Sequence, residues 1–480
     1  MIRGEPLTSA RAAVWLFALF QVPAAFLSFG HHFPDEHFQV LELLNYKLGL
    51  TPTSALPWEF HEAIRPFTQI AVYYPIVSVE RALGVVSPFV YEITLRLLSV
   101  SLGIAAFAMG LEYLSRIYTF DRRALLAMSS FAALPYLNAR LSFETVGASI
   151  FFIGLFATLR GIENQKHAWV FAGGLLLALA FHVRVQLAFM LMGLALWFVV
   201  EKRAFANRAL RDTLPLVAGM VLGVLLAVLA DHWGYGRWTF TPWSYVDAQF
   251  LRNKAAAWGT APWWDYLRMM SYQMMPPLGP LYFLVIVWFL SRERRSVLTY
   301  LMVPFFIGHC LVGHKEYRFL FPLALPFTFM LGIMLQATTV VGWKKVLFVI
   351  FTGANVLWLV VLPYRPASIE VMTYRYIYSH GVKDIYSMGG DPYTMAGLSV
   401  HFYRPPGVRI FRVTLEELQN TMARQPVTLF TERLLPFETG SVLERSCVAE
   451  YRSIPEWADQ VNVNDWLSRI PVWSLYRCRL

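Results

Sequence analysis

The stretch FTQIAVYYPIVSVERALGVV, residues 67–86, decides how this chain is threaded through a membrane. It is apolar and almost long enough to cross a bilayer, but it contains Gln69, Glu80 and Arg81. Of the 480 residues of the chain, 57% are hydrophobic and only 15% are charged, with a mean hydropathy of +0.47. A soluble protein of this length carries far more charge. The composition therefore predicts a polytopic α-helical membrane protein.

Other apolar windows have about the length that a bilayer-spanning helix needs. They fall at about 12–30, 94–115, 124–138, 144–160, 167–183, 185–200, 212–231, 275–290, 297–313, 319–338 and 344–363. We therefore expect about eleven transmembrane helices. The first window lacks a convincing small-residue cleavage site, so we expect a retained helix rather than a signal peptide.

The distribution of Lys and Arg favours a stretch 67–86 that lies along the membrane surface. If it does not cross and the N-terminus is inside, most loop cations are cytoplasmic, as membrane proteins prefer. These cations are Arg3, Arg11, Arg116, Arg122, Arg123, Arg160, Lys166, Lys202, Arg203, Arg208, Arg211, Arg292, Arg294, Arg295, Lys344 and Lys345. If the stretch 67–86 crossed the membrane, all the cations of this set that follow it would face outside. We predict an interfacial helix within a first external loop, residues 31–93.

The tail, residues 364–480, has no spanning run and differs from the predicted transmembrane domain, residues 1–363. VRIFRV, VTLFTE and CVAEY are typical of strands, and TLEELQNTMARQ between the first two indicates a helix capped by Thr414. We expect a small extracytoplasmic α/β domain. Cys447 and Cys478 form either a disulfide, in an oxidising compartment, or two buried thiols.

HHFPDEHFQ, residues 31–39, places Asp35 and Glu36 just beyond the first apolar window. Pro34 stiffens this turn. A carboxylate partly shielded from water at a membrane surface can act as a general base toward a sugar hydroxyl. The alternatives are a solvated loop and a metal site formed by these carboxylates with the neighbouring histidines. The spacing matches no familiar metal motif, so we expect no metal and no cofactor.

GHKEYRFLFP, residues 313–322, places His314, Lys315, Glu316 and Arg318 between two apolar windows, in a segment that the topology puts outside. Membrane proteins prefer Lys and Arg in cytoplasmic loops, so cations outside are unusual. We therefore expect an anionic group to bind them. A phosphate is the natural candidate, because Arg binds it as a fork and Lys as a point charge. The alternative is a structural ion-pair network around Glu316.

Two further external segments combine charge with aromatic rings. LPWEFHEAIRPF, residues 56–67, indicates either an amphipathic interfacial helix or a cleft wall. The loop 231–267 is rich in Trp and Tyr, which is typical both of a membrane-interface belt and of a sugar-stacking cleft. The formal net charge of +10 is spread over short loops without a basic, aromatic-interleaved stripe, which excludes a nucleic-acid-binding protein.

Together these motifs resemble glycosyltransferase family 22, the polyprenyl-phosphate-mannose-dependent mannosyltransferases of the GT-C superfamily. FPDEHFQ is similar to the family pattern His-Pro-Asp-Glu, an aromatic residue and Gln, with Phe33 in place of the histidine. HKEYRF matches the family's His-Lys-Glu-x-Arg-Phe. The other matching residues are Trp58, Glu59, Ile64, Arg65, Asp231, Tyr235, Gly236, Thr241, Pro242, Gly259, Thr260, Pro262 and Trp263. The resemblance covers residues 12–340; RLSFE around Arg140 and the tail depart from the pattern.

The resemblance implies a GT-C fold and transfer of mannose, or a related hexose, from a polyprenyl phosphate to a glycan or glycolipid with inversion. It implies Asp35 as the general base, with Glu36 beside it, and His314, Lys315, Arg318 and Arg65 at the donor phosphate. Trp58, Glu59, Asp231, Tyr235 and Trp263 are then expected at the acceptor or sugar site.

The expected partners are therefore the lipid-linked donor, the acceptor and the lipid bilayer, and no nucleic acid. A bacterial member would lie in the inner membrane with its site facing the periplasm; the alternative is the endoplasmic reticulum, with a lumenal site. Two other functions share many of these features. One is a flippase for a lipid-linked saccharide, which needs no base, and the other is a GT-C transferase for a different sugar.

Overall fold

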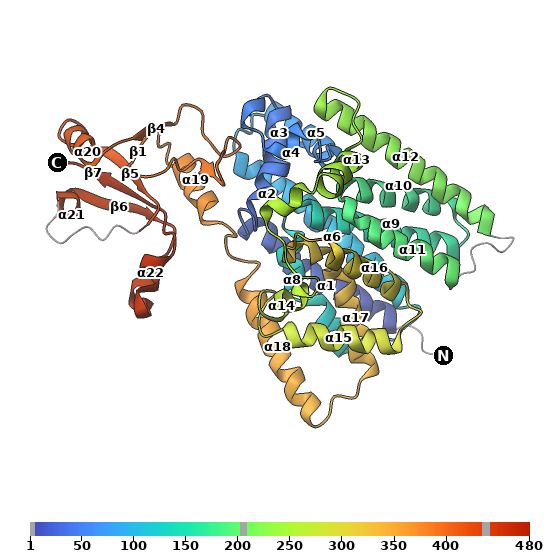
Figure 1. Cartoon of the computed structure of the whole chain (residues 1–480). Coiled ribbons are helices and arrows are strands. Elements are labelled where there is room, and N and C mark those ends of the chain that lie inside the picture. The colour runs from blue at the N-terminus through green and yellow to red at the C-terminus, as the bar shows by residue number, and fades with distance from the viewer. Residues whose placement is uncertain (1–4, 202–208, 434–441) are drawn as a thin grey trace. The chain divides into compact units, whose positions relative to one another are not determined.

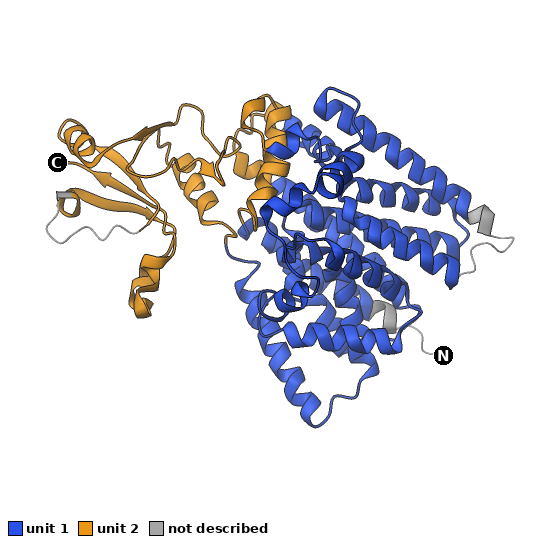
Figure 2. Ribbon diagram, viewed as in Figure 1, with its two compact units in different colours: residues 1–28, 58–79, 93–365 blue, residues 29–57, 80–92, 366–480 orange. Residues whose placement is uncertain are grey.

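The computed structural model describes residues 5–201, 209–433 and 442–480 (Figure 1). The predicted cytoplasmic cations Arg3, Lys202, Arg203 and Arg208, and the side chain of Arg211, lie outside this description. The chain divides into two compact units (Figure 2). Unit 1 contains residues 1–28, 58–79 and 93–365, and unit 2 contains residues 29–57, 80–92 and 366–480. Unit 2 thus joins parts of the first loop to the tail.

Apolar helices form nearly all of unit 1. Six helical segments in the described residues are long and apolar enough to span a membrane: Ser9–Leu27, Pro88–Leu114, Phe143–Glu163, Thr213–Tyr235, Tyr317–Ala337 and Trp343–Val361. Four shorter apolar segments are His167–Val183, Val185–Val200, Gly279–Arg292 and Val297–Leu311. Ten of the expected windows therefore coincide with apolar helices, while the count of about eleven crossings stays a prediction.

The eleventh window, 124–138, is not one helix. It consists of α7 (Arg122–Ser129) and α8 (Ala133–Asn138). Proline lacks a backbone N–H and is tolerated in a first helical turn, so a new helix that begins at Ala133 accommodates Pro135. The side chain of Asn355 satisfies the backbone at the break: its Oδ1 accepts from Ala132 N at 2.9 Å, and its Nδ2 donates to Ser130 O at 2.8 Å.

Helices α9 (Phe143–Glu163), α10 (His167–Val183) and α12 (Ala209–Tyr235) lie side by side, with α10 between the other two (Figure 1). Glycine permits the close approach of α10 and α12. A methyl group added at Gly174 would overlap the backbone oxygen of Leu216, and one at Gly219 would overlap that of Phe171. Small residues at helix crossings are a common device in membranes.

Two helices of unit 1 expose aliphatic side chains along much of their length. In α12 these include Leu214, Val217, Val221, Leu225 and Leu229, and in α18 (Trp343–Val361) they include Val346, Val349, Val356, Leu357 and Val360. Such surfaces are unfavourable in water and are at home in lipid. The stretch that was predicted to be interfacial forms α5 (Thr68–Ala82), which contains Pro75.

In unit 2, the tail forms a five-stranded sheet in the order β4-β1-β5-β7-β6. Strand β1 (Asp384–Ser387) pairs in parallel with β4 (Arg409–Arg412) and β5 (Val427–Thr431), and β7 (Ser474–Cys478) pairs antiparallel with β5 and β6 (Cys447–Arg452). The predicted strands β4, β5 and β6 are confirmed; β1 and β7 were not predicted.

The predicted helix is also confirmed as α20 (Leu415–Met422), with Thr414 as N-cap and a capping box to Glu417. Cys447 and Cys478 are opposite one another on β6 and β7 and form a disulfide in the structure. Unit 2 also contains α2 (Pro34–Glu36), η1 (His37–Leu41), α3 (Glu42–Lys47) and α19 (Ile369–Ser379).

Candidate active site

The segment 313–318 of unit 1 contains three cationic side chains, of which His314 and Arg318 contact the carboxylate of Glu316. The third, Lys315, donates from its Nζ to the backbone oxygen of Val312. It follows α16 (Val297–Leu311) and leads into η6 (Tyr317–Leu323). Arg318 approaches both oxygens of Glu316, with Nε at 2.6 Å and Nη2 at 3.0 Å. His314 Nε2 lies 2.9 Å from Glu316 Oε1, and its Nδ1 lies 3.0 Å from the backbone oxygen of Gly259. Both ring nitrogens therefore face acceptors, which the imidazolium form satisfies.

The protonation states of this segment follow from its contacts. The hydrogen bond with Glu316 raises the pKa of His314 above its ordinary value of 6.5. Burial alone would raise the pKa of Glu316, but the hydrogen bond from His314 and the charge of Arg318 outweigh it and lower that pKa to about 2. Burial lowers the pKa of Lys315. Glu316 is thus ionised at neutral pH, and the segment keeps a net positive charge.

Sequence-distant residues surround this segment. Ala261 N donates to Gly313 O at 2.9 Å, so the Gly-Thr-x-Pro segment at 259–262 lies against it. Two guanidinium groups lie near the ring of Phe319, with Arg318 Cζ at 5.5 Å and Arg184 Cζ at 5.3 Å from its centroid. Arg184 is buried and pairs with Glu144 at 2.9 Å. Arg184 is the cation of this cluster that sequence reasoning did not include among the site residues.

A second cluster of unit 1 connects the segment 58–67 with the end of α12. Tyr235 donates its hydroxyl to the backbone oxygen of Arg65 at 2.7 Å, and Arg65 Nη2 lies 3.5 Å from Glu59 Oε1. Arg65 and Glu59 are both buried. Two motifs that are about 170 residues apart in sequence are therefore joined, as a shared site requires.

Asp231 holds this connection in place. It is fully buried, and its Oδ1 accepts from Phe67 N at 2.9 Å while its Oδ2 accepts from the Thr241 hydroxyl at 2.7 Å. His182 Nε2 lies 3.0 Å from the same Oδ2. Because its oxygens already serve these donors, Asp231 positions two loops, and any effect on a bound sugar would be indirect.

The rim of this cluster is an ion-pair network. Glu62 accepts from Arg252 Nη2 at 2.7 Å and pairs with Lys254, whose ammonium lies 5.6 Å from the ring centroid of Trp58. These two hydrogen bonds lower the pKa of Glu62 to about 2. Trp263, by contrast, is 66% exposed. Its place at a sugar site stays a prediction.

Asp35 and Glu36 belong to unit 2. They occupy the first turn of α2, whose first residue is Pro34, a proline position that suits a helix start. Asp35 is partly exposed, whereas Glu36 is buried and accepts from His32 N at 3.2 Å. The next turn, η1, is a π-helix, a form that is frequent at functional sites. Asp35 is thus the more accessible of the two carboxylates.

Glu42 fastens the segment that carries Asp35 to the tail. Its side chain is fully buried and accepts from the backbone nitrogens of His401 at 2.7 Å and Phe402 at 2.9 Å. Its other contacts are His37 Nε2 at 2.8 Å and the Thr51 hydroxyl at 2.6 Å. Burial raises the pKa of Glu42, but these hydrogen bonds outweigh it and hold that pKa below its ordinary value. Sequence reasoning gave no role to this residue, since its partners come from three separate segments.

Replacing Glu42 is therefore expected to destabilise unit 2. Glu42→Ala would leave four donors, most of them buried, without their acceptor, at a cost of about 3 kcal/mol. Thermal unfolding in detergent should occur at a lower temperature, with faster proteolysis around residues 398–405. Glu416→Ala, which removes an exposed carboxylate of α20, is the matched control. An unchanged unfolding temperature for Glu42→Ala would refute this role.

Within the described ranges, no group of three or more His, Cys, Asp or Glu side chains is arranged to hold a metal ion. The predicted site residues of unit 1 form the two clusters above, apart from Trp263. The two clusters are linked through the end of α10, because His182 contacts Asp231 while Arg184 lies against Phe319.

Comparison with known proteins identifies relatives. A model of the Alg9-like mannosyltransferase family matches residues 12–388. The chain is 23% identical over 320 residues to human GPI alpha-1,2-mannosyltransferase 3, covering 65% of this chain and 55% of the relative. It is 22% identical over 336 residues to GPI mannosyltransferase 3 of Debaryomyces hansenii, covering 63% and 55%. The chain thus spans about half the length of these relatives.

A solved structure shares the fold. ArnT from Cupriavidus metallidurans bound to undecaprenyl phosphate superimposes with a TM-score of 0.54 and 12% sequence identity, covering 99% of this chain and 98% of that one. At this identity the likeness concerns the fold alone.

Proposed function

The chain belongs to the Alg9-like mannosyltransferase family, and from this membership we propose that it is a membrane enzyme that transfers mannose from a polyprenyl phosphate to a glycan or glycolipid. The observation that carries the proposal is the cationic segment 313–318, which follows the end of an apolar helix. In it His314 and Arg318 pair with Glu316, and Lys315 adds a third positive charge. A relative of Schizosaccharomyces pombe is named for Dol-P-Man as donor, and the ArnT structure contains a polyprenyl phosphate.

The cluster suits the chemistry of the leaving group. When the bond between the anomeric carbon and the phosphate oxygen breaks, the lipid phosphate gains negative charge. Arg318, whose Nε and Nη2 are bonded to Glu316, offers the positive charge of its oriented guanidinium, and Lys315 offers a compact charge for these oxygens. Donors that are already aimed where charge develops stabilise the transition state most. Arg65 is proposed to assist at the same phosphate.

The acceptor hydroxyl must lose its proton to a general base when its oxygen attacks. We assign this role to Asp35, which is partly exposed at a helix start. The acceptor hydroxyl gives its proton to the carboxylate, and its oxygen attacks the anomeric carbon as the phosphate departs. One displacement of this kind inverts the anomeric centre. Glu36 and Glu59 are proposed to orient the acceptor, with Trp58, Tyr235 and Trp263 as sugar contacts.

Side-chain cations neutralise the phosphate in this mechanism, so we propose that transfer uses no metal and no cofactor. Full activity in the presence of a chelator would agree with this, and restoration by Mg²⁺ or Mn²⁺ would overturn it.

We further propose that the site and the tail face the compartment outside the cytosol, the periplasm in a bacterium or the lumen of the endoplasmic reticulum. The disulfide between Cys447 and Cys478 supports this side, because disulfides persist in oxidising compartments. Single cysteines introduced at positions 364 and 35 should both react with an impermeant maleimide from that side. Opposite labelling would mean that α5 crosses the membrane.

The transfer reaction itself can be tested with membranes that contain the full chain. Labelled polyprenyl-phosphate mannose, supplied with cell-envelope glycolipids, should yield a mannosylated product together with free polyprenyl phosphate. A flippase would move the labelled lipid between leaflets without releasing the phosphate. If a panel of lipid-phosphate sugars showed transfer of another sugar only, the lipid phosphate of that sugar would be the donor in place of polyprenyl-phosphate mannose.

The pKa of His314 predicts how donor binding depends on pH. Since its folded pKa lies above 6.5, the imidazolium is fully present below that value and is lost as pH rises through the folded pKa. Affinity for polyprenyl phosphate should therefore fall about tenfold over this rise, the worth of one charged hydrogen bond. The lowered pKa of Lys315 adds to the loss at still higher pH. Glu316 stays ionised throughout.

Binding of polyprenyl phosphate in detergent, measured across pH, tests this prediction. In His314→Gln the decline of affinity at the pKa of His314 should disappear. In His167→Gln, a change at the start of α10, this decline should remain. A decline of the same size in His314→Gln would assign the titration to another group.

A further inference from the structure

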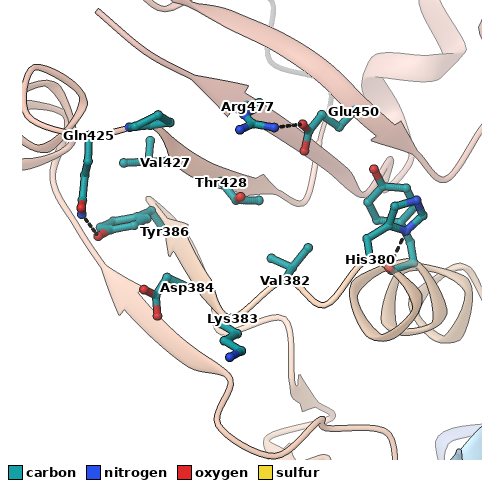
Figure 3. Close-up of a pocket in the computed structure, with 12 residues that line it drawn as sticks. His380, Val382, Lys383, Asp384, Tyr386, Gln425, Val427, Thr428, Glu450 and Arg477 are labelled. Carbon is teal, nitrogen blue, oxygen red and sulfur yellow. Dashed lines mark hydrogen bonds and ion pairs between the residues drawn. The ribbon is translucent and has the colours of Figure 1, made fainter.

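The tail contains a pocket that the proposed reaction does not use. It has a volume of about 430 Å³ and lies within unit 2, where β1 and β5 begin and α19 ends. Because these strands are parallel neighbours, their starts open at the same edge of the sheet. The volume is within the range of about 300–1,000 Å³ that is usual for small-ligand sites. Figure 3 shows Tyr386 and His380 at opposite ends of the pocket.

Charges of both signs surround the pocket, and the carboxylates among them are neutralised. Asp384 accepts two hydrogen bonds from Arg409, each 2.7 Å long, and Glu450 pairs with Arg477 at 3.5 Å. Lys383 also lines the pocket, and in the described part of the chain no carboxylate lies within ion-pair distance of it. An organic cation would meet the charge of Lys383 with both carboxylates already paired. A neutral ligand rich in hydroxyl groups meets donors and acceptors alternately.

Aromatic rings line both ends of the pocket, and contacts with neighbouring rings hold them in place. Tyr376 stacks on His380 with 3.9 Å between ring centroids and contacts Tyr451 at 4.7 Å. At the other end, Tyr386 stacks on Phe411 at 5.0 Å, and its hydroxyl accepts from Gln425 Nε2 at 3.3 Å. Aromatic side chains with a polar tip suit ligands that have both C–H faces and hydroxyl groups.

We propose that this pocket binds a saccharide unit of the acceptor glycan, at a subsite separate from the transfer site. The assignment of this saccharide to the acceptor rests on the proposed function, whereas the binding of a saccharide in the pocket does not. Thr428, Lys383 and Glu450 offer hydrogen bonds around the sugar, and the tyrosines offer its apolar contacts. A glycan that is anchored here is captured by the tail before its terminal hydroxyl reacts.

Binding of mannobiose to the full chain in lipid nanodiscs, without donor, tests the proposal. Saturation-transfer NMR should show saturable binding that Val382→Trp, which fills the pocket, weakens at least about tenfold. Val463→Trp makes the same change at an exposed site of the same unit and should bind normally. Glu450→Gln should also weaken binding, whereas Glu416→Gln should not. Because Glu450→Gln is a small change, it tests the pocket even if the tryptophan variant misfolds.

Four outcomes would count against the proposal. Undiminished binding in both pocket variants would overturn the site, and displacement of mannobiose by inorganic phosphate would make it an anion site. If mannobiose binds as expected but membranes show no transfer, the pocket stands as a saccharide site and its assignment to an acceptor falls. Transfer without mannobiose binding would leave the proposed function intact and remove the pocket from it.

Discussion

Asp35→Asn is expected to lower the rate of mannose transfer by about 10²–10⁴-fold, the usual contribution of a general base. The asparagine side chain has nearly the same shape as aspartate, but it does not accept the proton of the acceptor hydroxyl. Asp35 is partly exposed, and the two side chains have nearly the same volume, so the exchange should not impair folding. Initial rates with labelled polyprenyl-phosphate mannose, together with donor binding measured separately, provide the test.

The matched control is Asp459→Asn, which removes a carboxylate from the exposed pair with Arg452 in the same unit. It should transfer at the wild-type rate. Unchanged donor binding with lost transfer would identify a chemical role for Asp35. Wild-type transfer by Asp35→Asn would instead move the base to another carboxylate, with Glu36 as the neighbouring candidate.

Local sequence patterns predicted most helices because each depends on its own residues. Ten apolar windows became apolar helices, and Thr414 with Glu417 formed the expected capping box. The break between α7 and α8 was missed because hydropathy does not register the missing N–H of Pro135. Strands β1 and β7 were missed because their stability comes from pairing with distant strands.

In the candidate site, too, local features could be predicted from the sequence and distant contacts could not. The sequence indicated which residues are unusual, such as the charged residues of 313–318, but not the partners that buried charges find in distant segments. Arg140 and Glu144 are near neighbours in sequence, yet Glu144 pairs with Arg184, and His182 contacts Asp231. Glu42 attracted no notice, because its role depends on backbone nitrogens about 360 residues away. Tertiary partners of buried polar groups are not encoded in local spacing.

Arg318→Gln is expected to lower kcat for transfer by about 10²–10³-fold, the usual effect of losing one donor to a developing oxyanion. Arg318 is 9% exposed, and the bonds of its Nε and Nη2 to Glu316 fix the orientation of the guanidinium. Because the phosphate gains charge as the bond breaks, kcat should fall more than KM rises. Arg318→Lys should recover only part of the rate, since an ammonium lacks the planar group that Glu316 holds in a fixed orientation.

Arg295→Gln is the matched control, because Arg295 is 89% exposed and its nearest carboxylate, Glu201, lies 4.0 Å away. Its kinetics should equal those of the wild type. A rise in KM alone for Arg318→Gln would mean that the guanidinium anchors the donor equally in the ground state and the transition state. Wild-type kinetics, with only a lower unfolding temperature, would mean that the cluster around Glu316 is a structural ion-pair network, and the donor phosphate would then have to be sought elsewhere in unit 1.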